Sequence, residues 1–358
     1  MLAWLSSADP GRVHTEGRMA RAALEEAREQ VAAFLGTRGR QVVFTSCATE
    51  AINAAVFGAA ERWGSAHGEP PLFALAGVEH SAVREASQRH GTIVWIRVDG
   101  EGFVDPAAVA EALADRPVAL VHCQLANHEI GTVQRVVDVA HACRAAGVML
   151  HVDAAAGASC VPVDFDDLGA DFLSVSAAKL GGPRGSGALL VRRGLRVAPF
   201  MVGGMQERAR RAGLEDVAAA VGFGAAAAEL SSSQPEESAR VRVHVDELRD
   251  TASRIEGVQL YGPKDATGRL PGLLCIGVAG VEAEPVLIGL DQAGVAAHSG
   301  SSCSSESLEP SPVLEAIGAD ADHSLRFTGG WSTTEADIRT ACEALPAVVS
   351  RLRELAAR

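Results

Sequence analysis

Apolar and polar positions along the first two thirds of the chain repeat with two different periods. Residues 15–35 place apolar side chains on one face of a helix, and the short apolar run at 41–45 is typical of a strand. The expected strands that follow are 72–76, 92–98, 119–122, 149–152, 172–175 and 187–191, and the expected helices are 51–60, 81–90, 106–114 and 136–146. This alternation predicts a mainly parallel sheet covered by helices.

The pattern changes after an alanine-rich helical segment at 215–230. Residues 231–235 are three serines, a glutamine and a proline, which is typical of a break between elements. A second charged helix follows, and then short strands such as 273–278. We therefore expect an α/β protein with a large domain at 12–235 and a smaller α+β domain at 236–358, to which residues 1–11 also belong.

Composition narrows the function classes. Of the 358 residues, 47% are hydrophobic and 22% are charged, as in ordinary globular proteins. The formal net charge is -13 and the basic residues are scattered, so a basic patch for nucleic acid is not expected. No apolar run approaches the ~20 residues that cross a bilayer. The start of the chain also lacks the pattern of a secretion signal. We expect a cytoplasmic protein that binds neither membranes nor nucleic acid.

The cysteines suggest reactivity at one position. There are seven, widely spaced and without the pairs typical of zinc sites, so we predict no metal centre and no structural disulfides. Cys303 lies in a stretch of small polar residues at 297–306, where we expect a loop. A thiol in such a setting is a better candidate for chemistry than one in an apolar core.

A lysine and an aspartate each follow an apolar, strand-like run. Asp153 ends the segment that begins at His151, and Lys179 comes shortly after 172–175. The carboxyl ends of strands in an α/β sheet meet at one crevice, so we expect both side chains there. A lysine amine and a carboxylate in one pocket are what pyridoxal phosphate (PLP) requires. A surface lysine beside a strand-end aspartate is the alternative for these two residues alone.

Seven short motifs occur in a fixed order along the chain. They are Thr45-Ser46-Cys47-Ala48-Thr49-Glu50, Glu79-His80, Asn127-His128-Glu129-Ile130-Gly131, His151-Val152-Asp153, Ser176-Ala177-Ala178-Lys179, Gly300-Ser301-Ser302-Cys303 and Arg326. In this order they resemble the cysteine desulfurases of the class V aminotransferase group, from about Gly11 to the C-terminus. The resemblance implies the PLP-dependent transferase fold of type I, with a seven-stranded type of sheet. It also implies PLP as cofactor and L-cysteine as substrate.

The resemblance assigns roles to individual residues. Lys179 would bind PLP as a Schiff base, and Cys303 would accept the sulfur of the substrate. The remaining roles are ring stacking for His80, the pyridine nitrogen for Asp153, the phosphate for Ala48, Thr49 and Ser176, the ring hydroxyl or substrate for Asn127, and the substrate carboxylate for Arg326. An arginine suits the last role because its planar fork matches a carboxylate.

Each of these residues also has a plainer interpretation. Taken singly, His80 is a polar residue after a strand, and Thr49 is a helix cap. Asn127 is equally a turn residue, and Arg326 a partner in a surface ion pair. The order of the motifs favours the functional roles.

Four residues depart from the family pattern at the expected cofactor site. Ala178 replaces a histidine that binds the phosphate, Ala156 a glutamine near the ring hydroxyl, and Cys47 the glycine that opens the phosphate turn. Leu214 stands where the family has a threonine that reaches the phosphate of the neighbouring subunit. Each lost hydrogen bond to a charged group is worth about 1.5–3 kcal/mol, so we expect weakened PLP binding. A family segment rich in Asp, Ala and Thr, which lines the active site, also has no counterpart before residue 15.

The leading hypothesis is a homodimeric cysteine desulfurase that converts L-cysteine to L-alanine and passes sulfur from Cys303 to an acceptor protein. One alternative is a degenerate paralogue that acts as a binding or regulatory subunit, which Ala178, Ala156, Leu214 and the missing N-terminal segment favour. Another is a related PLP-dependent reaction, such as selenocysteine lysis or the cleavage of another carbon–sulfur bond. The sequence leaves these alternatives open.

Overall fold

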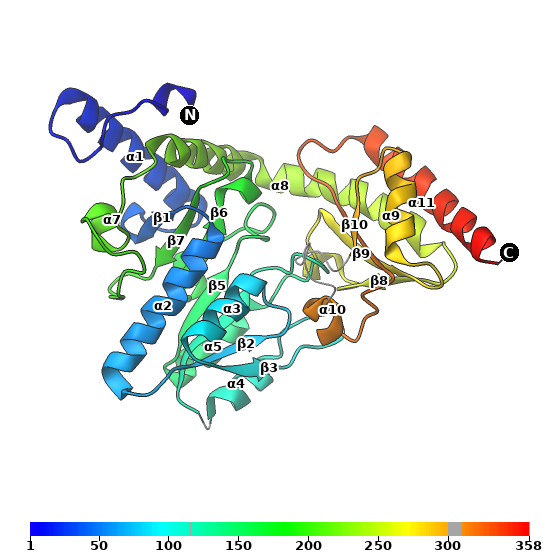
Figure 1. The fold of residues 1–358 in the computed structure, drawn as a ribbon, viewed down its shortest axis with the longest axis horizontal. Helices are drawn as coiled ribbons and strands as arrows, with labels where there is room; N and C mark the ends of the chain where they lie inside the picture. The colour runs from blue at the N-terminus through cyan, green and yellow to red at the C-terminus, as the bar shows by residue number, and fades with distance from the viewer. Residues whose placement is uncertain (115, 300–309, 358) are drawn as a thin grey trace. The chain divides into compact units, whose positions relative to one another are not determined.

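The computed structural model describes residues 1–114, 116–299 and 310–357 and divides into two compact units (Figure 1). Unit 1 comprises Met1–Arg97, Val104–Leu125 and Arg135–Gln234, and unit 2 comprises Val98–Phe103, Ala126–Gln134 and Pro235–Arg358. This division differs from the predicted domains because residues 1–11 cluster with unit 1, where Arg21 Nε donates to the carbonyl of Pro10. Two connecting segments also belong to unit 2, where Gln134 Nε2 donates to the carbonyl of Gly102.

Unit 1 is built on a seven-stranded sheet in the order β1-β7-β6-β5-β4-β2-β3. Its strands are β1 Val42–Thr45, β2 Leu72–Ala76, β3 Thr92–Ile96, β4 Val118–Gln124, β5 Met149–Asp153, β6 Phe172–Ser176 and β7 Gly187–Val191. Strands β2 to β6 pair in parallel, whereas β7 runs antiparallel to both of its neighbours. The predicted α/β class and the sheet of the seven-stranded type are confirmed.

Helices cover this sheet because its strands are apolar on both faces. All seven residues of β4 are buried, which is typical of a central parallel strand. Helix α2 packs on β6 and β7, and α5 packs on β4 and β5. The helices that lie in unit 1 are η1 Leu2–Trp4, α1 Thr15–Phe34, η2 Gly39–Gln41, α2 Ala48–His67, α3 Ser81–His90, α4 Pro106–Ala114, α5 Val136–Ala146, α6 Phe165–Leu168, η3 Ala177–Leu180 and α7 Gln206–Ala209.

The predicted break between elements at 231–235 is wrong, although the two units do divide there, between Gln234 and Pro235. Helix α8 runs without interruption over Val217–Ser253, with Pro235 inside it. The serines are accommodated because their hydroxyls bond to helix carbonyls: Ser231 Oγ donates to Ala227 O and Ser233 Oγ to Glu229 O, each at 2.9 Å. Polar composition alone therefore misreads a helix that satisfies its own hydroxyl groups.

Unit 2 carries a four-stranded antiparallel sheet in the order β10-β11-β9-β8. Its elements are β8 Val258–Tyr261, η4 Ala266–Gly268, β9 Leu273–Val278, α9 Ala283–Gln292, β10 His298–Ser299, α10 Pro312–Ala316, β11 Ser324–Thr328 and α11 Glu335–Ala356. Its core joins α8, α9 and α11 to β9 and β11 through side chains such as Val245, Ile276, Leu290 and Leu345. This arrangement agrees with the smaller α+β part expected from the sequence.

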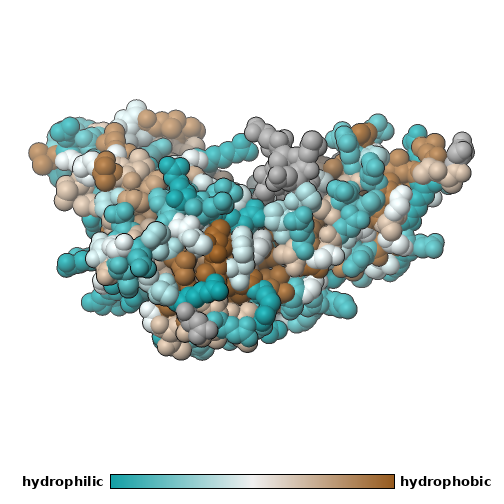
Figure 2. Space-filling view, turned by 60° about the horizontal axis from the view of Figure 1, so that its bottom comes forward, coloured by the Kyte–Doolittle hydropathy of each residue, from teal (hydrophilic) through white to brown (hydrophobic). Residues whose placement is uncertain are grey.

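Three further results concern the surface, membrane spans and metal sites. Figure 2 shows hydrophilic residues spread over one face of the molecule, with smaller hydrophobic patches between them. Within the described part of the chain, no helix combines the length and apolarity that a membrane span requires. The described residues also contain no cluster of His, Cys, Asp and Glu suited to a metal ion.

Candidate active site

Two neighbouring strands end at one edge of the sheet of unit 1 and deliver the aspartate and the lysine. Strand β5 ends at Asp153, whose register partner on β6 is Ser174. Strand β6 continues directly into η3, which carries Lys179. The Lys179 side chain is exposed, whereas Asp153 is buried with 7% of its surface accessible. The expected meeting of both residues at the carboxyl edge is therefore what the sheet provides.

His80 lies at the same edge and interacts electrostatically with both Asp153 and Lys179. It caps the start of α3, where its Nδ1 accepts a hydrogen bond from Ala82 N at 3.0 Å. Burial lowers the pKa of His80, the carboxylate of Asp153 raises it, and the positive charges of Arg84 and Lys179 lower it. Because Asp153 and Lys179 both act on this ring, the three side chains form one electrostatic cluster within unit 1.

The start of α2 forms the region expected to bind a phosphate. Gly187 on β7 pairs with Thr45 on one side and with Ser176 on the other, so the ends of β1 and β6 lie at the same level of the sheet. The backbone N–H groups of Ala48 and Thr49 have no acceptor among the described residues. A long helix with free N–H groups at its N-terminus favours an anion. These groups therefore fit the phosphate of PLP.

Cys47 alters this region in a way that the sequence did not reveal. Its backbone is extended, with φ −172°, so a side chain at the family's glycine position causes no backbone strain. Its Sγ accepts the N–H of Glu50 at 3.5 Å and acts as the helix cap. The thiol therefore occupies a donor that an anion at this helix end would otherwise share.

Asp153 has the geometry of a partner for the pyridine nitrogen. Its Oδ1 accepts hydrogen bonds from Ala155 N at 3.0 Å and from Ser174 Oγ at 3.4 Å. Among the described residues, no group donates to its Oδ2, which leaves that oxygen for a ligand. Burial raises the pKa of Asp153, and the two hydrogen bonds together with His80 act in the opposite direction. The pKa of Asp153 therefore lies above its ordinary value, and the donors reduce the shift that burial causes.

Glu79 is a buried carboxyl group beside Asp153 to which the sequence reasoning gave no role. Its Oε1 accepts the N–H of Gln124 at 2.7 Å, while its buried Oε2 has no partner in the described part of the chain. Burial is the main cause that raises the pKa of Glu79 to about 8. At neutral pH Glu79 is therefore mostly protonated, which limits its repulsion of the Asp153 carboxylate. Its place next to His80 in the motif was the available signal.

Two expected substrate residues, Asn127 and Arg326, belong to unit 2. Asn127 is fully buried, and its Oδ1 accepts the N–H groups of Glu129 and Ile130, both at 2.8 Å. Arg326 lies on β11, and its guanidinium donates to the carbonyl of His128 at 3.0 Å. The two residues therefore meet at one loop of unit 2. The turn role that the sequence allowed for Asn127 is real, and a ligand role for either residue stays a prediction.

The remaining expected site residues are placed as follows. Cys303 and the rest of its motif lie outside the described residues. Ala178 is exposed and Ala156 is half-buried. Because both residues are alanines, neither position offers a polar side chain. Leu214 is 63% exposed and follows the turn that contains α7. The four departures thus leave backbone N–H groups, Thr49 and Ser176 as the candidate phosphate ligands of this chain.

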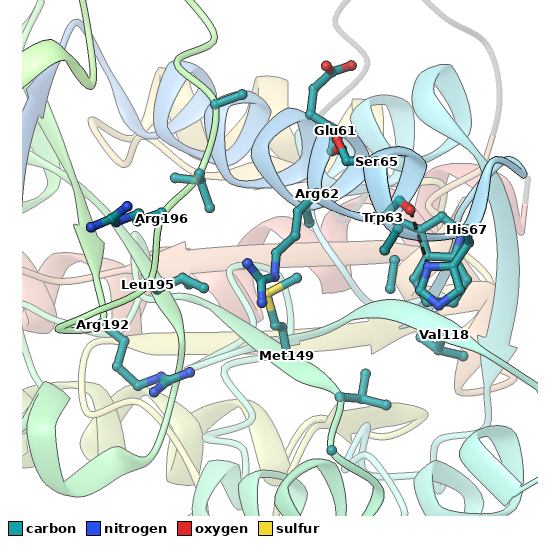
Figure 3. A pocket seen from close by; sticks show the side chains of 17 residues that line it. Glu61, Arg62, Trp63, Ser65, His67, Val118, Met149, Arg192, Leu195 and Arg196 are labelled. Atoms are coloured by element: carbon teal, nitrogen blue, oxygen red, sulfur yellow. Dashed lines mark hydrogen bonds between the residues drawn. The ribbon is translucent and has the colours of Figure 1, made fainter.

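A separate hollow of about 770 Å³ lies at the opposite ends of the parallel strands (Figure 3). Val118 and Met149, the first residues of β4 and β5, form part of its wall, and Arg62, Arg192 and Arg196 surround it. Asp153 and Lys179 follow the carboxyl ends of these strands and do not line this hollow. This hollow is therefore distinct from the expected cofactor region.

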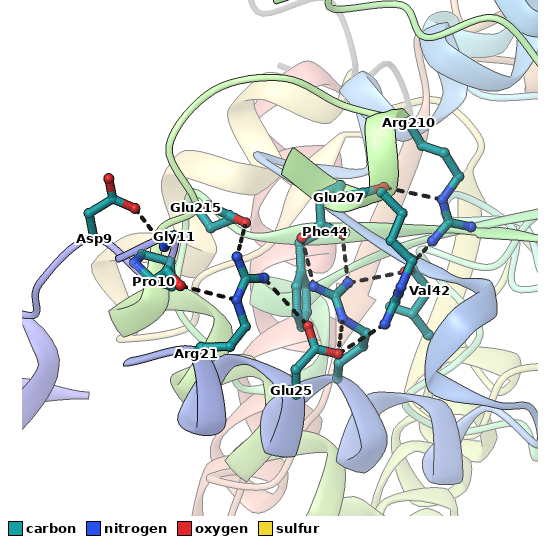
Figure 4. Close-up of polar contacts among 12 residues, drawn as sticks. Asp9, Pro10, Gly11, Arg21, Glu25, Val42, Phe44, Glu207, Arg210 and Glu215 are labelled. Atoms are coloured by element: carbon teal, nitrogen blue, oxygen red, sulfur yellow. Dashed lines mark hydrogen bonds and ion pairs between the residues drawn. The ribbon is translucent and has the colours of Figure 1, made fainter. Parts of the chain in front are cut away.

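A buried cluster around Glu207 holds the turn before Leu214 (Figure 4). Arg28 and Glu207 are 1% and 4% exposed and form two hydrogen bonds of 2.6 and 2.7 Å. Glu207 also accepts the N–H of Phe44 at 2.9 Å. Glu207, Arg208 and Ala209 all have positive φ, at 45°, 58° and 61°, which is strained for residues with side chains. The buried ion pair therefore fixes a strained turn in place.

Comparison with known proteins identifies the family. Residues 5–340 match the aminotransferase class-V family, so the chain belongs to this family. Cysteine desulfurase IscS of Dictyoglomus turgidum is 38% identical over 355 residues, which are 97% of this chain and 89% of that protein. Cysteine desulfurase IscS 1 of Archaeoglobus fulgidus is 37% identical over 354 residues, covering 97% and 91%. A solved NifS-like protein from Rickettsia africae superposes with a TM-score of 0.87 at 26% identity, covering 98% and 94%. The resemblance expected from the motif order is confirmed.

Proposed function

We propose that this protein is a PLP-dependent cysteine desulfurase. The observation that carries the proposal is the cluster of Lys179, Asp153 and His80 at the carboxyl edge of the sheet, in a chain of the class V aminotransferase family. The names of the relatives from Dictyoglomus turgidum and Archaeoglobus fulgidus support L-cysteine as the substrate. The products are L-alanine and a sulfur atom bound to the protein.

Each residue has a task that its position supports. PLP, when bound, supplies a ring that withdraws electrons from the substrate α-carbon. Lys179 anchors the cofactor and moves a proton at its Nζ, while Asp153 Oδ2 holds a proton on the pyridine nitrogen. His80 would contact the ring of PLP, and the N–H groups of Ala48 and Thr49, with Ser176, would bind its phosphate.

The sulfur step involves Cys303 and the substrate residues. The Cys303 thiolate attacks the substrate sulfur, and the carbon–sulfur bond breaks with its electron pair left on the substrate carbon. That carbon takes up the proton that the Cys303 thiol had lost, and the product leaves as alanine. The Cys303 persulfide then passes its outer sulfur to an acceptor protein. Arg326 binds the substrate carboxylate and Asn127 orients the substrate. This division of tasks follows the family resemblance.

The proposal includes a homodimer in the cytoplasm. The segment at 200–214 presents apolar side chains to solvent, among them Val202 at 82% and Met205 at 79% exposed. Leu2 at 79% and Leu5 at 67% do so near the N-terminus. A second copy of the chain would cover such side chains. Analytical ultracentrifugation tests this part, and a monomer at micromolar concentration contradicts it.

One experiment tests the activity. The purified protein is titrated with PLP while its visible absorbance is recorded, and alanine and sulfide are then assayed from L-cysteine with a thiol reductant. We expect Cys303→Ala to keep the absorbance band and lose both products, and the control Cys160→Ala to keep band and products. An absence of the band at saturating PLP contradicts the proposal and favours a degenerate binding subunit, which Cys47 and Ala178 would explain. Turnover that does not depend on Cys303 favours a different carbon–sulfur lyase.

A further inference from the structure

Four buried side chains connect Asp153 to the interior of unit 1 by successive hydrogen bonds. Ser174 Oγ lies 3.4 Å from Asp153 Oδ1, and His151 Nε2 lies 3.1 Å from Ser174 Oγ. His151 Nδ1 lies 2.9 Å from His122 Nδ1, and His122 Nε2 lies 3.3 Å from Ser87 Oγ. The chain therefore runs from β5 through β6 and β4 to helix α3.

These groups are sealed from water. Ser87, His151 and Ser174 are 0% exposed and His122 is 1% exposed. Burial lowers the pKa of His151 to about 3 and lowers the pKa of His122 well below its ordinary value, with a further decrease from His151. Both rings are therefore neutral at physiological pH, and each carries one N–H donor and one bare nitrogen acceptor.

Neutrality makes the chain directional. An ionised Asp153 only accepts, so the Ser174 hydroxyl donates to it and its oxygen accepts from His151 Nε2–H. The Nδ1 of His151 is then bare and accepts from His122 Nδ1–H. The Nε2 of His122 is bare in turn and accepts from the hydroxyl of Ser87. A reversed chain would point the hydroxyl of Ser174 away from Asp153 and leave that oxygen with one donor fewer.

We propose that Ser87, His122, His151 and Ser174 form a one-way hydrogen-bond relay that ends on Asp153, with His122 as the positioning residue that sets its direction. The relay fixes the tautomer of His151 and thereby keeps the Ser174 hydroxyl directed at Asp153 Oδ1. Asp153 remains an acceptor, and its Oδ2 is held toward the ligand side. The role toward PLP rests on the proposed function, whereas the tautomers do not.

His122 is suited to this task by its place in the fold. It lies in the middle of the fully buried strand β4, directly opposite His151 in the parallel register of β4 and β5. The two rings are 5.0 Å apart and nearly perpendicular, at 72°, which lets the two Nδ1 atoms face each other. The other charged or titratable groups near Asp153 are Glu79, His80 and Lys179, and none of them bonds to the relay among the described residues.

The decisive measurement is the tautomer of each ring in the protein without cofactor. Long-range ¹⁵N–¹H correlation spectra of ¹⁵N-histidine-labelled protein distinguish Nδ1–H from Nε2–H, and the variants His122→Asn and His151→Asn assign the two signals. We expect His151 as the Nε2–H form and His122 as the Nδ1–H form, both neutral from pH 5 to 8. A His151 in the Nδ1–H form, or a charged ring in this range, overturns the relay.

Two substitutions at His122 separate direction from mere packing. His122→Asn keeps an N–H donor near the position of Nδ1, whereas His122→Phe fills the space without one. We expect His122→Phe to lose the single Nε2–H form of His151 and to weaken PLP binding about fivefold to tenfold, as for one lost hydrogen bond. We expect His122→Asn to retain both properties, and His90→Phe on α3 to leave both unchanged. Equal losses in His122→Asn and His122→Phe at matched thermal stability contradict the positioning role.

The outcomes remain separable from those of the activity test. If the tautomers are as expected and PLP does not bind, the relay stands and the desulfurase proposal fails. If PLP binds and the tautomers are reversed, the desulfurase proposal stands and the relay fails.

Discussion

Unit 1 contains two buried polar clusters that are built from different chemistry. The relay below Asp153 consists of neutral histidines and serines, in which His122, His151 and Ser174 each use one donor and one acceptor and Ser87 ends the chain with its hydroxyl on His122. The cluster before Leu214 pairs a full charge on Arg28 with one on Glu207. In the proposed relay the neutral cluster orients Asp153, while the charged cluster holds a backbone turn that is strained by itself.

The difference shows what each kind of interaction is suited to do. The removal of one partner from a buried ion pair is strongly destabilising, because it leaves a bare charge in the interior. A neutral hydrogen-bond chain loses less when one member is replaced, since no charge is exposed to low dielectric. The strained backbone at 207–209 is therefore held by an ion pair, whereas neutral hydrogen bonds are enough to orient the Asp153 carboxylate.

Removal of the acidic partner from the charged cluster should have the largest effect. Glu207→Ala leaves Arg28 buried without its carboxylate and releases the strained turn. We expect the free energy of unfolding to decrease by about 3–5 kcal/mol, measured by urea denaturation. The control Glu111→Ala, which breaks an exposed pair with Arg97, should change it by less than about 1 kcal/mol. Similar small changes in both variants would contradict the assigned role of the pair.

Glu79 tests whether the region around Asp153 depends on a carboxyl group that stays neutral. Its pKa is raised from 4.5 to about 8, so the folded protein keeps a proton that the unfolded chain loses over this interval. Stability contributed by Glu79 is therefore full below pH 4.5 and is lost as the pH rises to about 8. The contribution amounts to roughly 1.4 kcal/mol for each unit of the shift.

Glu79→Gln should remove this pH dependence because the amide does not titrate. We expect the variant to lose less stability than the wild type between pH 5 and 8, measured by thermal unfolding at intervals of half a pH unit. Glu61→Gln on the exposed part of α2 serves as control and should follow the wild-type profile. An unchanged profile in Glu79→Gln would show that Glu79 ionises normally.

Gly187→Ala tests whether the region around Asp153 also depends on the close approach of the β7 backbone at Gly187 to Cys47 and Val175. A Cβ at this position would lie 2.7 Å from the carbonyl carbon of Cys47 and 2.8 Å from Val175 O, and neither atom is free to move aside. We expect a loss of about 1–3 kcal/mol in stability and weaker PLP binding, because the ends of β1 and β6 are forced apart. Gly64→Ala in α2 is the matched control, and it should be neutral or stabilise by up to about 1 kcal/mol. Equal stability of Gly187→Ala and wild type would contradict the close approach.

Cys47→Gly should give the smallest effect and one of opposite sign. The thiol no longer accepts the N–H of Glu50, which then becomes available to the phosphate together with those of Ala48 and Thr49. We expect PLP affinity to increase about threefold to tenfold in an absorbance titration, with a loss of a few tenths of a kcal/mol in stability. Cys47→Ser keeps a cap and should leave the affinity near that of the wild type. Unchanged affinity in Cys47→Gly would show that the thiol does not compete with the anion.

The sequence was sufficient for the sheet and for the strand ends. Asp153 and Lys179 could be placed because each follows an apolar run, and the chemistry of parallel sheets collects such residues at one edge. Ser87 and His122 could not be found in this way, since one lies inside a helix and the other inside a strand, where polar residues carry no positional signal. Their pairing depends on the register of β4 against β5, which only the folded chain defines.

Two other misses have equally local causes. The polar run at 231–235 suggested a break, but serine hydroxyls can bond to carbonyls within the same helix. The pair of Arg28 and Glu207 joins residues that are 179 positions apart in the chain, so no local pattern announces it. The left-handed turn at 207–209 escaped prediction for a different reason. Residues 207–209 contain no glycine, and glycine is the usual sequence signal for positive φ.

The pairing of β1 has a consequence for the order in which the protein is made. Strand β1 is the edge strand of its sheet, and its partner in the described structure is β7, which leaves the ribosome much later. Strands β2 to β5 can assemble while synthesis continues, whereas β1 and the start of α2 wait for Gly187. Pairing between such distant segments is slow compared with local contacts. A nascent chain that stalls before β7 would therefore hold a nearly complete parallel sheet without the start of α2 in place.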